Sequence, residues 1–187
     1  MFFEIAMRRQ VVLVPHELGN HLHTRRAVFR RLLLDLDTLR CSEDHGYYVA
    51  VTTIENLSEG VIRSGSGSVV YWIDFKCIVY MPVAKEIVEA QVSKVTGMGF
   101  FADCGPLDEI MVASREMNGF EFRPAEVATF NLWKDLSGNE IGVNAVVRLQ
   151  IIGFKYIPEE RRFRAVGTLN GNFLGHLPDF GKKEPSI

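Results

Sequence analysis

An adjacent aromatic pair, Phe100 and Phe101, is the feature of this sequence with the clearest chemical use. Phe100, Ala102 and Cys104 alternate with Phe101 and Asp103, and alternate residues of a strand face opposite sides. Because Ala102 and Cys104 suit a core and Asp103 suits solvent, the alternation predicts that Phe101 is exposed. An exposed aromatic ring on a small barrel is a platform on which an unpaired nucleic-acid base can stack.

A second interpretation of Phe101 stays open, in which its ring packs under the N-terminal half of the chain. In the stacking interpretation, the nearest basic groups in the strand pattern are Lys94, Arg148 and Lys155. Together with Phe101 they form the predicted nucleic-acid-binding set, with the cationic side chains contacting phosphates.

No set of residues predicts an active site. The turn 65–67 (GSG) precedes a strand rather than joining a strand to a helix, so it does not favour a phosphate cradle. Residues 179–181 copy a kinase tripeptide without the other kinase motifs. His21 and His23 are two apart on an expected helix and do not face one another. The sequence therefore predicts a protein that is not an enzyme, with no metal and no cofactor.

The composition of the chain further limits the class of protein to which it can belong. The 187 residues are 47% hydrophobic and 24% charged, which is typical of a folded domain. The net charge of −2 argues against bulk electrostatic binding to nucleic acid, so any such contact should be local and weak. Cys41, Cys77 and Cys104 form no Cys-x-x-Cys pair, which favours reduced thiols. The short apolar runs and the early charges predict neither a membrane span nor a secretory signal.

The first half of the chain predicts an α+β unit. Residues 2–14 form an expected strand that Pro15 ends, and apolar residues at helical spacing follow over 18–36. Three further segments rich in β-branched and aromatic residues predict an antiparallel meander: 47–54, 61–62 and 69–81. Arg25, Arg26, Arg30 and Arg31 mostly occupy the other helix face, where they bind phosphate or simply face solvent.

The second half predicts an all-β barrel. Alternating or β-rich segments are expected as strands at 88–92, 100–104, 110–113, 143–151 and 163–169. The polar stretch 114–142 predicts a long loop, and 158–162 a hairpin turn. Five strands with an insertion between the third and fourth are typical of an OB-fold barrel. The expected domains are 1–81 and 82–177, with a frayed polar tail at 178–187.

The sequence resembles one known family along nearly its whole length. The resemblance begins at 46–54 (GYYVAVTTI), 60–62 (GVI) and 65–67 (GSG). It continues through 78–82 (IVYMP), 86–92 (EIVEAQV), 99–106 (GFFADCGP), 148–153 (RLQIIG), 167–169 (GTL) and 173–175 (FLG). These runs are similar to those of the RNA polymerase stalk family, which contains the RNA polymerase II seventh subunit, its archaeal counterpart and the plant polymerase IV and V paralogues.

The resemblance implies both a fold and a function. It implies an N-terminal tip domain, RNP-like, followed by an OB-fold RNA-binding domain. Such a protein pairs with the fourth subunit, docks through its tip on the polymerase core in the nucleus, and contacts emerging single-stranded RNA. The implied roles are transcription initiation and transcript handling. Asn56, Gly60, Gly65 and Gly67 then belong to the core-docking part of the tip.

Several positions depart from the family pattern. Val112 stands where related domains carry a histidine on the third barrel strand, Ser64 precedes Gly65 in place of proline, and Trp72 follows Tyr71 where proline is usual. Residues 83–85 (VAK) replace a typical Phe-Lys-Gly. The chain is therefore a divergent member, and two alternatives stay open. One is a free-standing OB-fold protein that binds single-stranded RNA outside any polymerase, and the other is the seventh subunit of a specialised plant-type polymerase.

Overall fold

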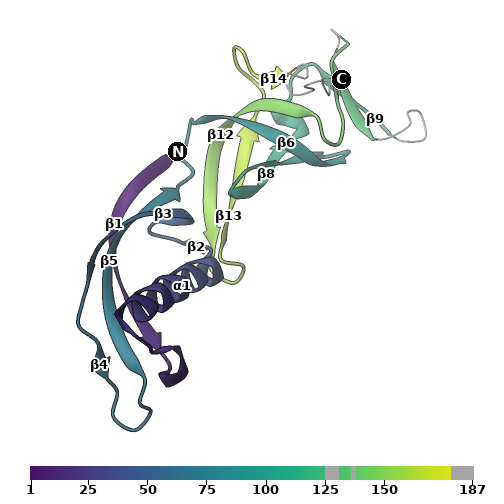
Figure 1. The fold of residues 1–187 in the computed structure, drawn as a ribbon. Helices are drawn as coiled ribbons and strands as arrows, with labels where there is room; N and C mark the ends of the chain where they lie inside the picture. Colours follow the sequence, from purple (N-terminus) through teal and green to yellow (C-terminus); the bar gives the residue numbers. More distant parts are fainter. Residues whose placement is uncertain (125–130, 136–137, 178–187) are drawn as a thin grey trace, which may run out of the picture. The chain divides into compact units, whose positions relative to one another are not determined.

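The computed structural model describes residues 1–124, 131–135 and 138–177, and the chain forms two compact units, Met1–Met81 and Pro82–Ile187. The described residues are mostly β-structure in several sheets, with one α-helix (Figure 1). Among these residues no helix has the length and apolar character that a membrane crossing requires. The predicted tail 178–187 lies outside the described residues.

The N-terminal unit is a curved antiparallel sheet built on β5 (Val69–Tyr80). Strand β1 (Phe2–Leu13) pairs with β5 along its whole length, and β3 (Gly46–Leu57) pairs with the other edge (Figure 1). The short strand β2 (Cys41–Ser42) extends the sheet beyond β3. Long runs of β-branched and aromatic residues favour these strands because such side chains pack well on a pleated surface.

The predicted meander is wrong in one respect. Strand β4 (Val61–Ile62) does not lie beside β3 but follows it along the same edge of β5, where Val61 is opposite Val70. The main chain of Ser58 donates to the Trp72 carbonyl, and the Ser58 hydroxyl accepts from the Trp72 amide. These bonds hold the segment between β3 and β4 against β5, so β4 continues along the edge of β5 that β3 occupies instead of pairing with β3.

Helix α1 (His21–Leu39) covers one face of this sheet. The side chain of Asn20 accepts a hydrogen bond from the His23 amide and caps the first turn. Val28, Leu32 and Leu36 recur every four residues and are buried, as a helix face toward a core requires. Their apolar partners come from β1 and β5: Val11, Leu13, Ile73, Phe75, Cys77 and Val79.

The C-terminal unit contains a closed five-stranded barrel. Its strands are β6 (Ile87–Thr96), β7 (Gly99–Cys104), β8 (Leu107–Ala113), β12 (Val146–Ile157) and β13 (Arg162–Thr168). They pair in the order β6-β7-β8-β13-β12, and β12 pairs back to β6. Only the β8–β13 pair among them is parallel. A short strand, β14 (Gly175–His176), adds to β12.

One glycine shows how closely the barrel strands approach. Gly99 has φ +146, and a Cβ there would lie 2.1 Å from the carbonyl oxygen of Val112. No other residue fits this position without displacing β8. The alternate residues of the five strands fill the barrel interior, and Phe100, Ile110, Val112, Leu149 and Ile151 are fully buried.

The expected long loop over 114–142 is wrong, because this stretch holds a second small sheet. After the short 3-10 turn η2 (Ser114–Glu116), β9 (Phe120–Arg123), β10 (Leu132–Asp135) and β11 (Glu140–Ile141) pair in the order β11-β10-β9. Trp133 is buried beside Phe122, and its indole nitrogen donates to the Thr96 carbonyl. Two aromatic side chains thus anchor β9 and β10, although the polar composition of this stretch favours a loop.

Candidate functional site

Phe101 lies in a hollow on the outside of the barrel. Phe100 is fully buried in the interior, whereas Phe101 is half-buried and lines a hollow of ≈ 560 Å³. The two residues therefore face opposite sides of β7, as the alternation predicts. The other lining residues come from β8, β12 and β13: Glu109, Met111, Gly153, Phe154, Lys155, Arg164, Ala165 and Val166.

The strand register explains which side chains meet in this hollow. Phe101 is opposite Met111 on β8, and Met111 is opposite Val166 on β13. Val166 is in turn opposite Gly153 on β12, while Lys94 of β6 is opposite Phe101 on its other side. Three apolar side chains therefore form a continuous row across β7, β8 and β13. Gly153 has no side chain at the end of that row, and the space that a Cβ would occupy there is empty.

A charged row lies beside the apolar one. Glu109 precedes Met111 by two residues on β8, and Arg164 precedes Val166 by two on β13, so both share its face of the sheet. Lys155 of β12 is opposite Arg164. The hollow thus presents apolar and aromatic surface next to one carboxylate and two cations.

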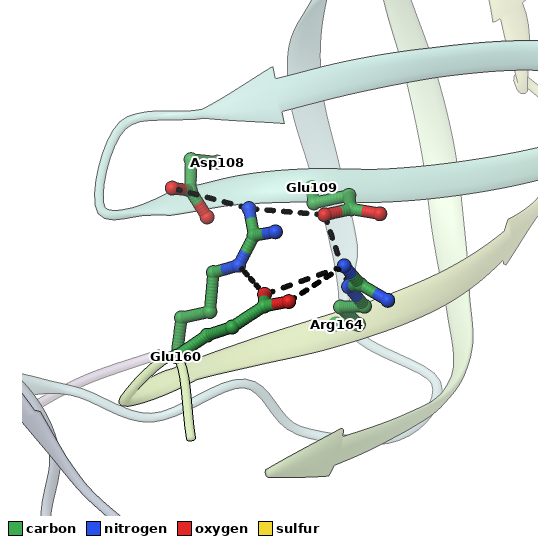
Figure 2. Close-up of polar contacts among 5 residues, drawn as sticks. Asp108, Glu109, Glu160 and Arg164 are labelled. Atoms are coloured by element: carbon green, nitrogen blue, oxygen red, sulfur yellow. Dashed lines mark hydrogen bonds and ion pairs between the residues drawn. The ribbon is translucent and has the colours of Figure 1, made fainter. Parts of the chain in front are cut away.

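Arg164 belongs to a network of ion pairs (Figure 2). Its guanidinium lies 3.1 Å from Glu109 and 3.2 Å from Glu160. Arg162 contacts the same two glutamates and lies 3.8 Å from Asp108. The hydrogen bond from Arg162 lowers the pKa of Glu160 and raises the pKa of Arg162. Two arginines face three carboxylates, so Arg164 is already neutralised and offers little to a phosphate.

The four predicted RNA-binding residues do not all lie together. Lys155 lines the hollow and Lys94 is the strand neighbour of Phe101. Neither lysine pairs with a carboxylate in the part of the chain that the structure describes. Arg148 is separate, because it donates to Glu89 at 2.8 Å. It precedes Lys155 by seven positions on β12, roughly 20 Å along a strand.

Sequence reasoning missed Glu109, Met111, Phe154, Arg164 and Val166 as members of this hollow. Arg164 and Val166 alternate with buried residues and so signal an outward face, but nothing local shows that β13 lies beside β8. Val112, which departs from the family pattern, is fully buried. Its side chain faces the barrel interior and is not part of the outer surface.

The four predicted docking residues lie in two neighbouring parts of the N-terminal unit. Asn56 and Gly60 line a hollow of ≈ 570 Å³ with Arg25 and Tyr71 among its other walls. Gly65 and Gly67 lie in the loop between β4 and β5, with φ +88 and +68. Gly60 is constrained differently, since a Cβ there would lie 2.6 Å from Val69 and 2.8 Å from Tyr71.

The described residues contain no cluster of His, Cys, Asp and Glu able to hold a metal.

The sequence was compared with known proteins, and no family model matches the chain. Over 180 residues the chain is 35% identical to DNA-directed RNA polymerase II subunit RPB7 of Glycine max, covering 96% of this chain and 98% of that protein. It is 32% identical over 179 residues to DNA-directed RNA polymerase II subunit 7 of Arabidopsis thaliana, covering 96% and 98%. The chain belongs to the RNA polymerase subunit 7 family.

Subunit 7 proteins of more than one polymerase match the chain. DNA-directed RNA polymerase V subunit 7 of Arabidopsis thaliana is 30% identical over 180 residues, covering 96% of this chain and 99% of that protein. A solved structure of a candidate exosome complex RNA-binding protein has a TM-score of 0.36 and 22% identity, covering 53% of this chain and 49% of that one. That likeness is too weak to support a fold assignment. The subunit 7 matches span both compact units, so both hollows lie within the family's shared length.

Proposed function

We propose that this chain is a non-catalytic stalk subunit of a DNA-directed RNA polymerase in the nucleus, with RNA polymerase II as its host. The observation that carries the proposal is the nearly full-length match to RNA polymerase II subunit 7 of two plants. The identity to the polymerase V relative is slightly lower over the same span. The proposed roles are transcription initiation and handling of the transcript.

The N-terminal unit is the proposed tip domain. It docks on the polymerase core through the surface around Asn56, Gly60, Gly65 and Gly67 and pairs with the fourth subunit. Exposed apolar side chains support a protein partner for this unit, since Ile62 is 72% exposed and Val61 63%. Exposed apolar side chains that adjoin one another are typical of protein contact surfaces.

The C-terminal barrel is the proposed OB-fold domain. OB-folds bind oligonucleotides on the face of their second and third strands. In this barrel those strands are β7 and β8, which carry Phe101, Glu109 and Met111. The hollow around Phe101 thus lies on the face that this fold commonly uses for nucleic acid.

The proposed RNA contact combines stacking with two local charges. Base stacking on an aromatic ring is worth about 1–3 kcal/mol per base. Lys94 and Lys155 supply phosphate contacts beside the ring, and the net charge of −2 adds little long-range attraction. Binding is therefore weak, selective for single strands and centred on Phe101.

A free-standing OB-fold protein that binds single-stranded RNA is the alternative from another class. The hollow around Phe101 is sufficient for that function, but the second hollow beside Gly60 and the full-length match favour a polymerase subunit. A specialised plant-type polymerase is the alternative host, supported by the polymerase V relative.

Affinity purification of the tagged chain from native extract tests these alternatives. We expect the largest subunits of RNA polymerase II and the fourth subunit to co-purify. Recovery of the largest subunit of another polymerase instead would change the host. Recovery of RNA without any polymerase subunit would support the free-standing protein.

A further inference from the structure

We infer that Glu109 selects the base that stacks on Phe101, so that the hollow prefers cytosine, which presents an amino group, over uracil, which presents a carbonyl. This inference rests on the proposed RNA contact at Phe101. It adds a base preference and names the side chain that imposes it.

Glu109 is within reach of a base on Phe101. Phe101 is directly opposite Met111, and Glu109 lies two residues from Met111 on the same face of β8. Diagonal neighbours of this kind are about 7–8 Å apart, which long side chains and aromatic rings can span. A base lying on the ring of Phe101 therefore points one edge toward the Glu109 carboxylate, which lines the same hollow.

The Glu109 carboxylate is held in place and still has an open acceptor. Arg162 lies 3.0 Å from its Oε2, and Arg164 donates to the same Oε2 at 3.1 Å (Figure 2). No residue in the described part of the chain donates to Oε1. The side chain is 23% exposed and lines the hollow, and Oε2 is the oxygen that both arginines anchor.

An anchored carboxylate distinguishes two bases of equal size. Carboxylates only accept hydrogen bonds, and cytosine offers the N4 amino group as a donor where the uracil-type base has the O4 acceptor. Oε1 of Glu109 therefore attracts cytosine and repels uracil, while stacking on Phe101 treats both alike. A hydrogen bond to a charged group is worth enough for about a tenfold preference.

The experiment titrates the full chain with fluorescently labelled oligocytidine and oligouridine of equal length at neutral pH. The wild type is expected to bind the cytidine strand about tenfold more tightly. Glu109→Gln is expected to lower the ratio to one or below, because the carboxamide oxygen stays on the arginines and the amide NH2, which only donates, faces the hollow and favours O4 over N4. The shape of the side chain and its acceptor oxygen toward the arginines are retained.

Glu160→Gln is the matched control. It removes the same charge from the same two arginines, since Glu160 contacts both Arg162 and Arg164, but Glu160 does not line the hollow. We expect its cytidine-to-uridine ratio to equal that of the wild type. Any general effect of the network's charge on RNA affinity appears in both variants.

The outcomes separate this inference from the function on which it rests. If the wild type binds oligocytidine and oligouridine with equal affinity, the base preference is overturned without any variant. A ratio lost equally in Glu160→Gln and Glu109→Gln also overturns it, because long-range charge would then explain the effect. Phe101→Ala with wild-type affinity for both strands overturns the proposed RNA contact, and the base preference with it.

Discussion

The ring of Phe101 lies between Met111 and Lys94 in the strand register, so truncating it removes the aromatic face of the hollow while both neighbours stay. A stacked base loses about 1–3 kcal/mol when the ring is replaced by alanine. Phosphate contacts of single lysines are screened by salt and partly replaced by counterions. At the residue scale, stacking therefore contributes more to RNA binding than any single charge.

We predict that Phe101→Ala weakens binding of a short labelled RNA about tenfold or more. Lys94→Ala and Lys155→Ala should each cost less, and Arg148→Ala least, because Arg148 is paired with Glu89. Fluorescence titrations at two salt concentrations measure these losses. Wild-type binding by Phe101→Ala together with a large loss in Arg148→Ala would show that the surface is purely electrostatic and contradict the stacking model.

The second prediction at this scale concerns Glu160, whose pKa Arg162 lowers through a hydrogen bond. A carboxyl with a lower pKa in the folded than in the unfolded chain stabilises the fold above its unfolded pKa, near ~4.3. That stabilisation is lost as the pH falls through the lowered folded value. We expect the wild type to melt at a higher temperature than Glu160→Gln at pH 7, and the difference to vanish under acid conditions.

Thermal unfolding followed from pH 7 to strongly acid pH measures this difference. Glu159→Gln is the control, because the neighbouring Glu159 is exposed and has no ion pair within the described part of the chain. A gap between the wild type and Glu160→Gln that is the same at every pH would mean that the network does not contribute through the charge of Glu160.

At the element scale, the turns beside β4 combine two different constraints. Gly65 has a positive φ and open space around its Cα, whereas Gly60 needs space because Val69 and Tyr71 lie within 3 Å of a Cβ there. A β-branched residue resists a positive φ by more than about 1 kcal/mol. Either substitution therefore distorts the proposed docking surface, but for different reasons.

We predict that Gly60→Val and Gly65→Val both reduce co-purification of the polymerase core and leave the C-terminal barrel folded. Gly65→Asn should retain most of the association, because asparagine tolerates the left-handed region. Gly60→Ala should already reduce it, since even a single Cβ meets the Tyr71 ring. Core recovery from extract and circular dichroism of the purified variants measure the two effects. Full recovery of the core with both valine variants would remove these turns from the docking surface.

At the scale of the whole molecule, two small units each have a limited core. Domains below about 100 residues bury a smaller share of their surface and are correspondingly marginal. Large apolar side chains remain exposed in both units, with Ile62 72% and Phe173 89% exposed. A partner that covers such side chains stabilises the folded chain by mass action.

We predict that the chain expressed alone does not give a monodisperse, thermally robust monomer. Co-expression with the fourth subunit should raise its melting temperature and give a single heterodimer. Size-exclusion chromatography and thermal unfolding of both preparations measure this. A monodisperse, thermally robust monomer obtained from the chain alone would contradict the expectation.

Features with a local signal could be predicted from the amino-acid sequence. The alternation of 100–104 put Phe100 inside and Phe101 outside. The helical spacing of apolar residues over 18–36 marked the helix but only part of its buried face, since Leu32 and Leu36 are buried while Leu22 and Leu33 are exposed. Such periods depend only on which side of one element a residue occupies. The same reasoning missed the sheet β9–β11, because its order comes from the contact of Trp133 with Phe122 and Thr96 rather than from a period.

Which outward side chains share a hollow depends instead on how the strands pair in the folded barrel. Glu109 and Arg164 are 55 positions apart in the chain, and they meet because β8 and β13 pair in parallel. A strand pattern tells which side a residue faces but not which strand lies next to it or how far along the barrel it sits. The alternation of 143–151 puts Arg148 on the outer face and Lys155, seven positions later, on the opposite one, and the irregularity between Ile151 and Gly153 changes that register. The closed barrel places Arg148 beside Glu89 and Lys155 in the hollow that Phe101 lines.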